Sequence, residues 1–191
     1  MSQLDVQIPA KPSQPKPEIS ATTPDWSREA CTFLKWEPSR KLLRSIRRYQ
    51  YWKGRLGPIG FIFSRFAVLS HRFWSIVTAS EIPLNSQLGG GLILPHPNGV
   101  VINPGASIGP NCLLNQQVTL GYGGKFPGNP TIGGHVDVGA GAKILGGITI
   151  GDHAKVGANA VVLCDVPPYA TAVGVPARVL TKAVKSADTN N

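Results

Sequence analysis

Aliphatic residues recur every six positions through the second half of the chain. The residue after each aliphatic is usually glycine, and the residue four positions on is small or aliphatic. One two-residue slip separates Leu94 from Ile102, and a longer break separates Leu120 from Ile132. The thirteen aliphatic positions that share this spacing are 82, 88, 94, 102, 108, 114, 120, 132, 138, 144, 150, 156 and 162.

A period of six predicts a parallel β-helix. It is too short for a helical solenoid and does not match the alternation of sandwich strands, whereas short strands that turn at Gly, Asn or His have this spacing. Each aliphatic side chain then stacks on those of the neighbouring coils and fills one continuous core. We therefore expect a β-helical domain over residues 81–181. The alternative, an irregular glycine-rich domain, is disfavoured by thirteen units in one register.

Helical patterns precede the repeat, over residues 25–80. Asp25 or Ser27 can cap a short first helix. Pro38 suits the first turn of a second helix, in which apolar residues recur every three or four positions with arginines between them. The segment "KGRLGPIG" breaks this helix, and a more apolar helix follows it. The overall expectation is a mainly β protein with a short N-terminal α-helical segment.

The two ends of the chain lack periodic apolar residues. Residues 1–24 are rich in Pro, Ser and Lys, which predicts a disordered tail, and residues 182–191 predict a flexible one. The N-terminus has no apolar core of a secretory signal, and no apolar stretch is long enough to cross a bilayer. Cys31, Cys112 and Cys164 are scattered without metal spacing, as in reduced cytosolic proteins. We therefore expect a cytoplasmic protein.

The net charge of +9 belongs to one part of the chain. Residues 28–72 hold eleven Lys and Arg against two Glu, which accounts for the whole net charge. A solvated helix face over the assembled protein is the favoured explanation. The alternatives are an anionic glycan, weak contact of the basic segment 40–55 with a membrane surface, or nucleic acid. Nucleic acid is least favoured, because no recognition motif accompanies the charge.

The two-residue slip at 95–101 is the first candidate for a functional site, because a break in a rigid repeat leaves a loop free to vary. His96 lies in this slip, and imidazole is a well-matched general base near neutral pH. Glu81, fifteen residues earlier, is the nearest acidic residue and the candidate to orient the ring. The alternative role for His96 is a turn histidine bonded to backbone.

The second break, at residues 121–130, predicts an extruded loop. Beyond it, His135 and His153 occupy the same position of their hexads, eighteen residues apart, so we expect them to stack at one corner. Gln117, eighteen residues before His135, would continue this stack. Two histidines without a carboxylate or thiolate partner make a weak metal site, and no metal is expected.

Four segments carry a resemblance to a known family: "HPNGVVI", "VTLG", "GAGAKILGGITIGDHAKVGANAVV" and "AVGVPARVL". They resemble the serine acetyltransferase-like branch of the hexapeptide-repeat acyltransferases, over about residues 81–180. The resemblance implies a left-handed parallel β-helix and a homotrimer. It also implies acetyl-CoA as the acyl donor and three active sites, each between neighbouring subunits.

The resemblance also implies roles for single residues. His96 matches the catalytic histidine of the family, and Glu81 matches its acidic partner at the same separation. Lys155 is placed to supply a point charge near a phosphate of CoA. The positions that match cofactor-binding ones are Tyr122, Gly123, Ala140, Lys155, Ala158, Pro176 and Arg178.

The departures from the family concern the acceptor. Serine acetyltransferases carry an aspartate where this chain has Pro95, and an Arg-His pair where its shorter loop has Gly128 and Asn129. Pro95 and Asn129 are therefore the candidate acceptor-binding positions. The first hypothesis is acetylation of a sugar hydroxyl in exopolysaccharide or capsule biosynthesis. The alternative is serine O-acetylation in cysteine biosynthesis, and the third is a non-enzymatic trimeric β-helix scaffold, which the candidate site residues disfavour.

Overall fold

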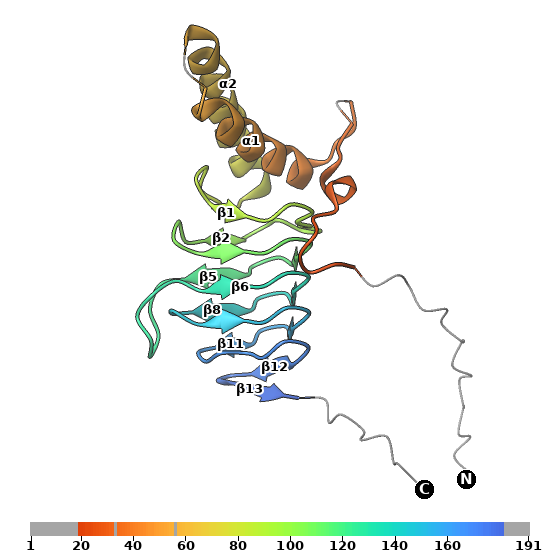
Figure 1. Ribbon diagram of the computed structural model, residues 1–191, viewed down its shortest axis with the longest axis vertical. Helices are drawn as coiled ribbons and strands as arrows, with labels where there is room; N and C mark the ends of the chain where they lie inside the picture. Colours follow the sequence, from red (N-terminus) through yellow and green to blue (C-terminus); the bar gives the residue numbers. More distant parts are fainter. Residues whose placement is uncertain (1–18, 33, 56, 182–191) are drawn as a thin grey trace, which may run out of the picture.

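The computed structural model describes residues 19–32, 34–55 and 57–181 (Figure 1). Two helices stand at one end of a column of triangular coils, and the last strands close the opposite end. The prediction of a mainly β protein, a left-handed parallel β-helix with a short N-terminal α-helical segment, is confirmed.

Three sheets form the faces of the column, and each is named here after its first strand. The β1 face holds β1, β3, β6 and β9, the β4 face holds β4, β7, β10, β12 and β13, and the β2 face holds β2, β5, β8 and β11. All pairs are parallel except the terminal β12–β13 hairpin. The strands are β1 Gln87–Leu88, β2 Val101–Ile102, β3 Ser107–Ile108, β4 Leu113–Leu114, β5 Thr119–Gly121, β6 Thr131–Ile132, β7 Asp137–Val138, β8 Lys143–Leu145, β9 Thr149–Ile150, β10 Lys155–Val156, β11 Val161–Val162, β12 Thr171–Gly174 and β13 Ala177–Leu180.

The predicted aliphatic positions form the core of the column. All of them are buried except Leu88, which is half-buried in the first coil. Ile102, Leu120 and Ile144 follow one another on successive coils of the β2 face, in direct register. Burial of one such side chain stabilises the fold by about 1.5–3 kcal/mol. The repeated aliphatic therefore drives each coil onto the next.

The spacing of paired residues shows where the coils differ in length. Glu81 pairs with Val101, so the first coil takes twenty residues. The pairing of β4 with β7 spans twenty-four residues, from Leu113 to Asp137, and that of β7 with β10 returns to eighteen. The extra six residues belong to the connection 122–130, which confirms the predicted extruded loop.

A column of corner residues joins the β1 face to the β4 face. Asn111, His135, His153 and Tyr169 all have a φ between 51° and 61°, the left-handed conformation that closes this turn. The Nδ1 atoms of the two histidines lie 2.9 Å apart, and the ring of His153 stacks on Tyr169. The prediction that Gln117 continues this stack is wrong. The inserted loop shifts the register by six residues, so Asn111 takes that place.

The segment before the first helix lies along the same corner. The side-chain amide of Asn111 donates to the carbonyls of Ser20 and Thr23, at 2.7 and 2.8 Å, and its Oδ1 accepts from the backbone N–H of Asp25. For residues 19–24 the predicted disordered tail is therefore wrong, because a buried side chain holds this segment. The remainder of that tail, residues 1–18, and residues 182–191 lie outside the described part of the chain.

The predicted helical elements are present. Asp25 caps a 3₁₀ helix, η1 (Trp26–Glu29), by accepting from the backbone N–H of Ser27. Helices α1 (Pro38–Lys53) and α2 (Pro58–Thr78) each begin at a proline, whose fixed φ suits a first helical turn. The buried side chains of α1 pack on the end of the β-helix core.

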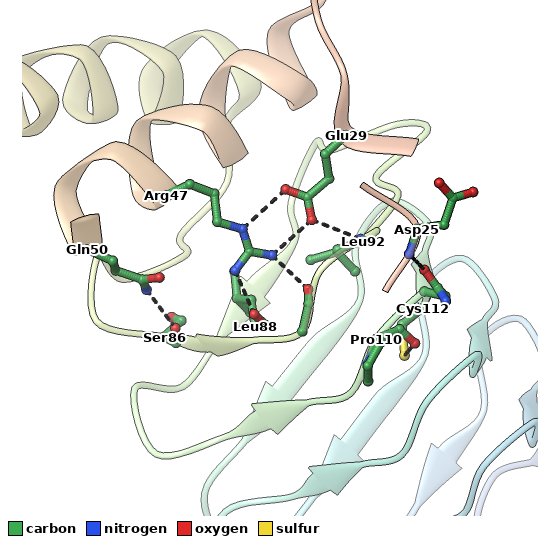
Figure 2. A network of polar contacts seen from close by, with 11 residues as sticks. Asp25, Glu29, Arg47, Gln50, Ser86, Leu88, Leu92, Pro110 and Cys112 are labelled. Atoms are coloured by element: carbon green, nitrogen blue, oxygen red, sulfur yellow. Dashed lines mark hydrogen bonds and ion pairs between the residues drawn. The ribbon is translucent and has the colours of Figure 1, made fainter. Parts of the chain in front are cut away.

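An ion pair within this region docks α1 on the first coil (Figure 2). The guanidinium of Arg47 donates to both carboxylate oxygens of Glu29 and to the carbonyls of Leu88 and Gly89. One oxygen of Glu29 also accepts from the backbone N–H of Leu92, at 3.1 Å. Only 21% of the Arg47 side chain and 8% of the Glu29 side chain are exposed. Arg47 is therefore a structural link, although its neighbours form a basic face.

We expect Arg47→Met to destabilise the protein by about 3 kcal/mol, because it leaves the Glu29 carboxylate buried without its counter-charge. Urea unfolding followed by circular dichroism measures this change. Arg48→Met is the matched control, since Arg48 is exposed one residue away, and it should change the unfolding free energy by less than about 0.5 kcal/mol. Equal effects of the two substitutions would contradict the docking role of Arg47.

Candidate functional site

The longer first coil positions His96 at the corner between the β4 face and the β2 face. The turn that follows it closes with a hydrogen bond from the N–H of Val100 to the carbonyl of Pro97, with Gly99 at a φ of 68°. The N–H of Gln117, on the next coil, donates to the carbonyl of Asn98 at 2.8 Å. The backbone around His96 is thus fixed on both sides, while its ring is exposed.

Glu81 is placed at the head of the β2 face. Its N–H donates to the carbonyl of Val100 and its carbonyl accepts from Ile102, at 2.8 and 2.9 Å. No hydrogen bond or ion pair joins Glu81 to His96, so the orientation of the ring by Glu81 stays a prediction. Within the described residues, the ring of His96 has no backbone partner either. The alternative of a turn histidine bonded to backbone therefore receives no support.

Two of the residues predicted to bind acetyl-CoA lie at the corner that holds His96, on later coils of the column. The N–H of Gly141 donates to the carbonyl of Gln116, and the N–H of Asn159 donates to that of Ala140, both at 2.8 Å. Ala140 and Ala158 consequently occupy the same edge as His96, on lower coils.

The cationic candidates lie toward the C-terminal end of the column, with Arg178 beside this edge and Lys155 on the adjoining β4 face. Lys155 lies on β10 and pairs with Thr171 of β12, and Arg178 lies on β13 opposite Val173. Pro176 lies in the turn between β12 and β13. All three candidates are exposed. Four coil steps separate His96 from this hairpin, and at about 4.8 Å a step they span roughly 19 Å.

Tyr122 and Gly123 lie at the opposite edge of the β2 face, at the base of the extruded loop. Hydrogen bonds from the N–H groups of Gly146 and Gly147 hold this loop, to the carbonyls of Gly121 and Phe126. From Gln117 at one edge to Tyr122 at the other the chain crosses the face over about 16 Å, at roughly 3.3 Å a residue. One chain therefore brings His96, Ala140 and Ala158 to one edge and Tyr122 and Gly123 to the other.

The two acceptor candidates also lie apart. Pro95 is exposed and borders a hollow of about 320 Å³ beside Trp36 and Arg40. The side chain of Asn129 packs over Gly105 at the loop corner, where a Cβ on Gly105 would meet the Asn129 amide. The Oδ1 atom of Asn129 is buried and has no hydrogen-bond partner among the described residues. Asn129 therefore makes a structural contact at this corner and is also a candidate to bind the acceptor.

Lys143 is a further candidate site residue that the sequence pattern did not indicate. It lies on β8, in the outward column of the β2 face between the two edges. Its Nζ donates to the carbonyl of Gln117 and to Oγ1 of Thr119, at 2.7 and 3.0 Å. In the sequence only its outward position on a strand would indicate Lys143, and that position can be assigned only when the length of the inserted loop is known.

Two kinds of structural feature are absent from the described residues. Among them, no three His, Cys, Asp or Glu side chains come together in a way that would hold a metal ion. Within the same residues, no helix is long and apolar enough to cross a membrane.

No family model matches the chain. The serine acetyltransferase of Synechococcus elongatus is 46% identical over 118 residues, which is 61% of this chain and 48% of that protein. The solved structure of a soybean serine acetyltransferase complexed with serine aligns with a TM-score of 0.64 and 38% identity. A serine acetyltransferase from Brucella abortus strain S19, in complex with coenzyme A, aligns with a TM-score of 0.64 and 33% identity.

The overlap with these proteins is partial. The two structural alignments cover 76% and 77% of this chain, and 58% and 57% of the solved chains. The chain thus spans between 48% and 58% of the length of these relatives. Over the part they share, the chain is similar in sequence to serine acetyltransferases and has their hexapeptide-repeat β-helix fold.

Proposed function

We propose that the protein is an acetyl-CoA-dependent O-acetyltransferase with His96 as its general base. The observation that carries this proposal is the single edge that aligns the exposed ring of His96 with Ala140 and Ala158, with Arg178 beside its C-terminal end and Lys155 on the adjoining β4 face. An edge of roughly 19 Å suits an extended thioester, with its reactive end at His96 and its phosphates at the cations.

The chemistry assigned to His96 is one proton transfer. Acetyl-CoA supplies the thioester carbonyl, and the ring of His96 takes the proton of the acceptor hydroxyl as that oxygen attacks. The backbone on both sides of His96 is hydrogen-bonded, so the ring is presented from a rigid corner. Glu81, at the head of the adjoining face, is the proposed positioning residue, and it acts once the neighbouring subunit and substrates order the site.

The separation of the two edges supports a homotrimer, which is part of the proposal. Tyr122 and Gly123 belong to one edge of the β2 face and His96 to the other, so one acetyl-CoA contacts both sets only between two chains. A cyclic trimer provides three such grooves, each with the loop of one subunit against the His96 edge of the next. Acetyl-CoA and a small acceptor are available together in the cytoplasm, which is the location we propose.

The acceptor supported best is L-serine, because the similar proteins are named serine acetyltransferases, and one solved chain is complexed with serine. A sugar hydroxyl is the second candidate. It is favoured by Pro95, which has no charge beside His96, and by Asn129, a neutral residue in the loop. A zwitterionic amino acid needs charged partners, and each one lost costs a few kcal/mol of discrimination.

We expect His96→Ala to lower acetyl transfer by about a hundredfold or more, because no other group replaces the base. Acetyl-CoA binding, measured by calorimetry, should change little. Light scattering serves as the control and should give about three times 20.3 kDa for both proteins. Activity near that of the wild type would remove His96 from the mechanism, and an active monomer would refute the shared site.

Glu81→Gln should lower kcat and leave the KM for acetyl-CoA and the assembly unchanged, because it weakens only the orientation of the imidazole. Glu81→Asp should restore part of the rate, because it returns a carboxylate to the same position, and this rescue separates positioning from a structural role. A kcat in Glu81→Gln equal to that of the wild type would show that the two residues are unconnected.

The acceptor is tested by thiol release from acetyl-CoA with a panel of hydroxyl compounds. We expect L-serine to give a kcat/KM of about 10⁴ M⁻¹s⁻¹ or more, in the ordinary enzyme range. Rescue of a bacterium that lacks serine acetyltransferase, on cysteine-free medium, provides an independent readout. Poor transfer to serine with efficient transfer to a saccharide would establish the second candidate. Absence of transfer to every acceptor would favour the scaffold hypothesis.

A further inference from the structure

Helix α2 presents its large apolar side chains to solvent. The residues that it buries are small ones, Gly60, Ala67 and Thr78. Six large apolar residues recur every three or four positions on the exposed side, which places them on one face of the helix. They form an outer stripe in which each residue is 50–81% exposed: Ile59, Ile62, Phe66, Leu69, Phe73 and Ile76. At 1.5 Å a residue the outer stripe is about 26 Å long.

The charge around the outer stripe has one sign. Residues 38–80 contain nine Lys and Arg and no Asp or Glu. Arg65 and Arg72 lie three or four positions from members of the stripe and so flank it on the helix surface. A groove of about 510 Å³ beside Phe66 adds Lys41, Arg44 and Arg48 of α1 to its lining.

The apolar stripe and the positive charge beside it together favour one kind of binding partner. A second copy of this chain, docked through the same stripe, would bring the flanking arginines together without acidic partners. Nucleic acid would match the charge and leave the six apolar side chains in water. The boundary between the headgroups and acyl chains of an anionic bilayer satisfies both features, because an amphipathic helix buries its apolar face there while cations contact the headgroups.

We propose that the outer stripe of α2 docks the protein on a membrane surface that contains anionic lipids, with the helix lying in the interface. No described helix is suited to span the bilayer, which agrees with surface attachment. The helices project beyond the first coil, at the end of the column opposite β13 (Figure 1). Docking therefore holds the coil of His96 nearest the membrane. The proposal does not depend on the identity of the acceptor.

Vesicle flotation with the full chain tests this proposal. We compare vesicles of phosphatidylcholine alone with vesicles that contain 30% phosphatidylglycerol, and we expect at least tenfold tighter binding to the anionic vesicles. Leu69→Gln with Phe73→Gln should weaken that binding at least tenfold. Leu180→Gln is the matched control, because Leu180 is similarly exposed on β13 at the far end, and it should bind as the wild type does.

Charge and folding are checked in the same series. Arg65→Gln with Arg72→Gln should reduce binding to anionic vesicles and leave any residual binding to neutral ones unchanged. Thermal unfolding should be similar for all variants, since the substituted side chains are exposed.

Three results would overturn the proposal. The first is equal binding to the two kinds of vesicle, or binding to neither. The second is unchanged vesicle binding in the stripe variant, with heparin binding as tightly as anionic vesicles, which would indicate a general basic patch. The third is a stripe variant that forms a smaller assembly in sedimentation while vesicle binding is unaltered, which would make the stripe a contact between copies of this chain.

Discussion

The stacking of one coil on the next is the interaction on which the rest of this protein depends. An aliphatic side chain at every sixth position enters the column, and the backbone N–H and carbonyl groups of each strand pair with the coils above and below. Apolar burial drives the stacking, and the hydrogen bonds set the vertical register. Because the register is shared by all three faces, a residue at one corner has defined neighbours on every coil.

The candidate site uses places where that regularity is relaxed. The first coil is longer by two residues, and the extra chain carries His96 outward at a corner without disturbing Leu94 or Ile102 in the core. The six residues inserted at 122–130 leave the column at a different corner and return in register. A rigid core with variable corners thus presents an exposed imidazole and an extruded loop on either side of the β2 face.

Polar contacts attach the N-terminal region to the column. Arg47 and Glu29 link α1, η1 and the first coil, while Asn111 holds the segment from Ser20 to Asp25 along the corner opposite the β2 face. These contacts use one of the basic residues internally. Arg65 and Arg72 remain exposed beside the apolar face of α2, so positive charge and exposed apolar surface occur together there.

The period of six by itself predicted a parallel β-helix, since it states which side chain of each hexad enters the core, while the left hand of that helix was implied only by the family resemblance. The same pattern located the first break, and with it His96, and the loop at 121–130. Vertical neighbours were decided only by the tertiary structure, because they depend on how many residues each coil takes. For this reason Asn111 stacks with His135 where Gln117 was expected. Lys143 likewise lies on the β2 face, although the sequence pattern did not single it out. The separation of Tyr122 from His96 and the outward face of α2 also required the structure. A local pattern shows that a helix or coil has an apolar side, and only the packed partners show which side is covered.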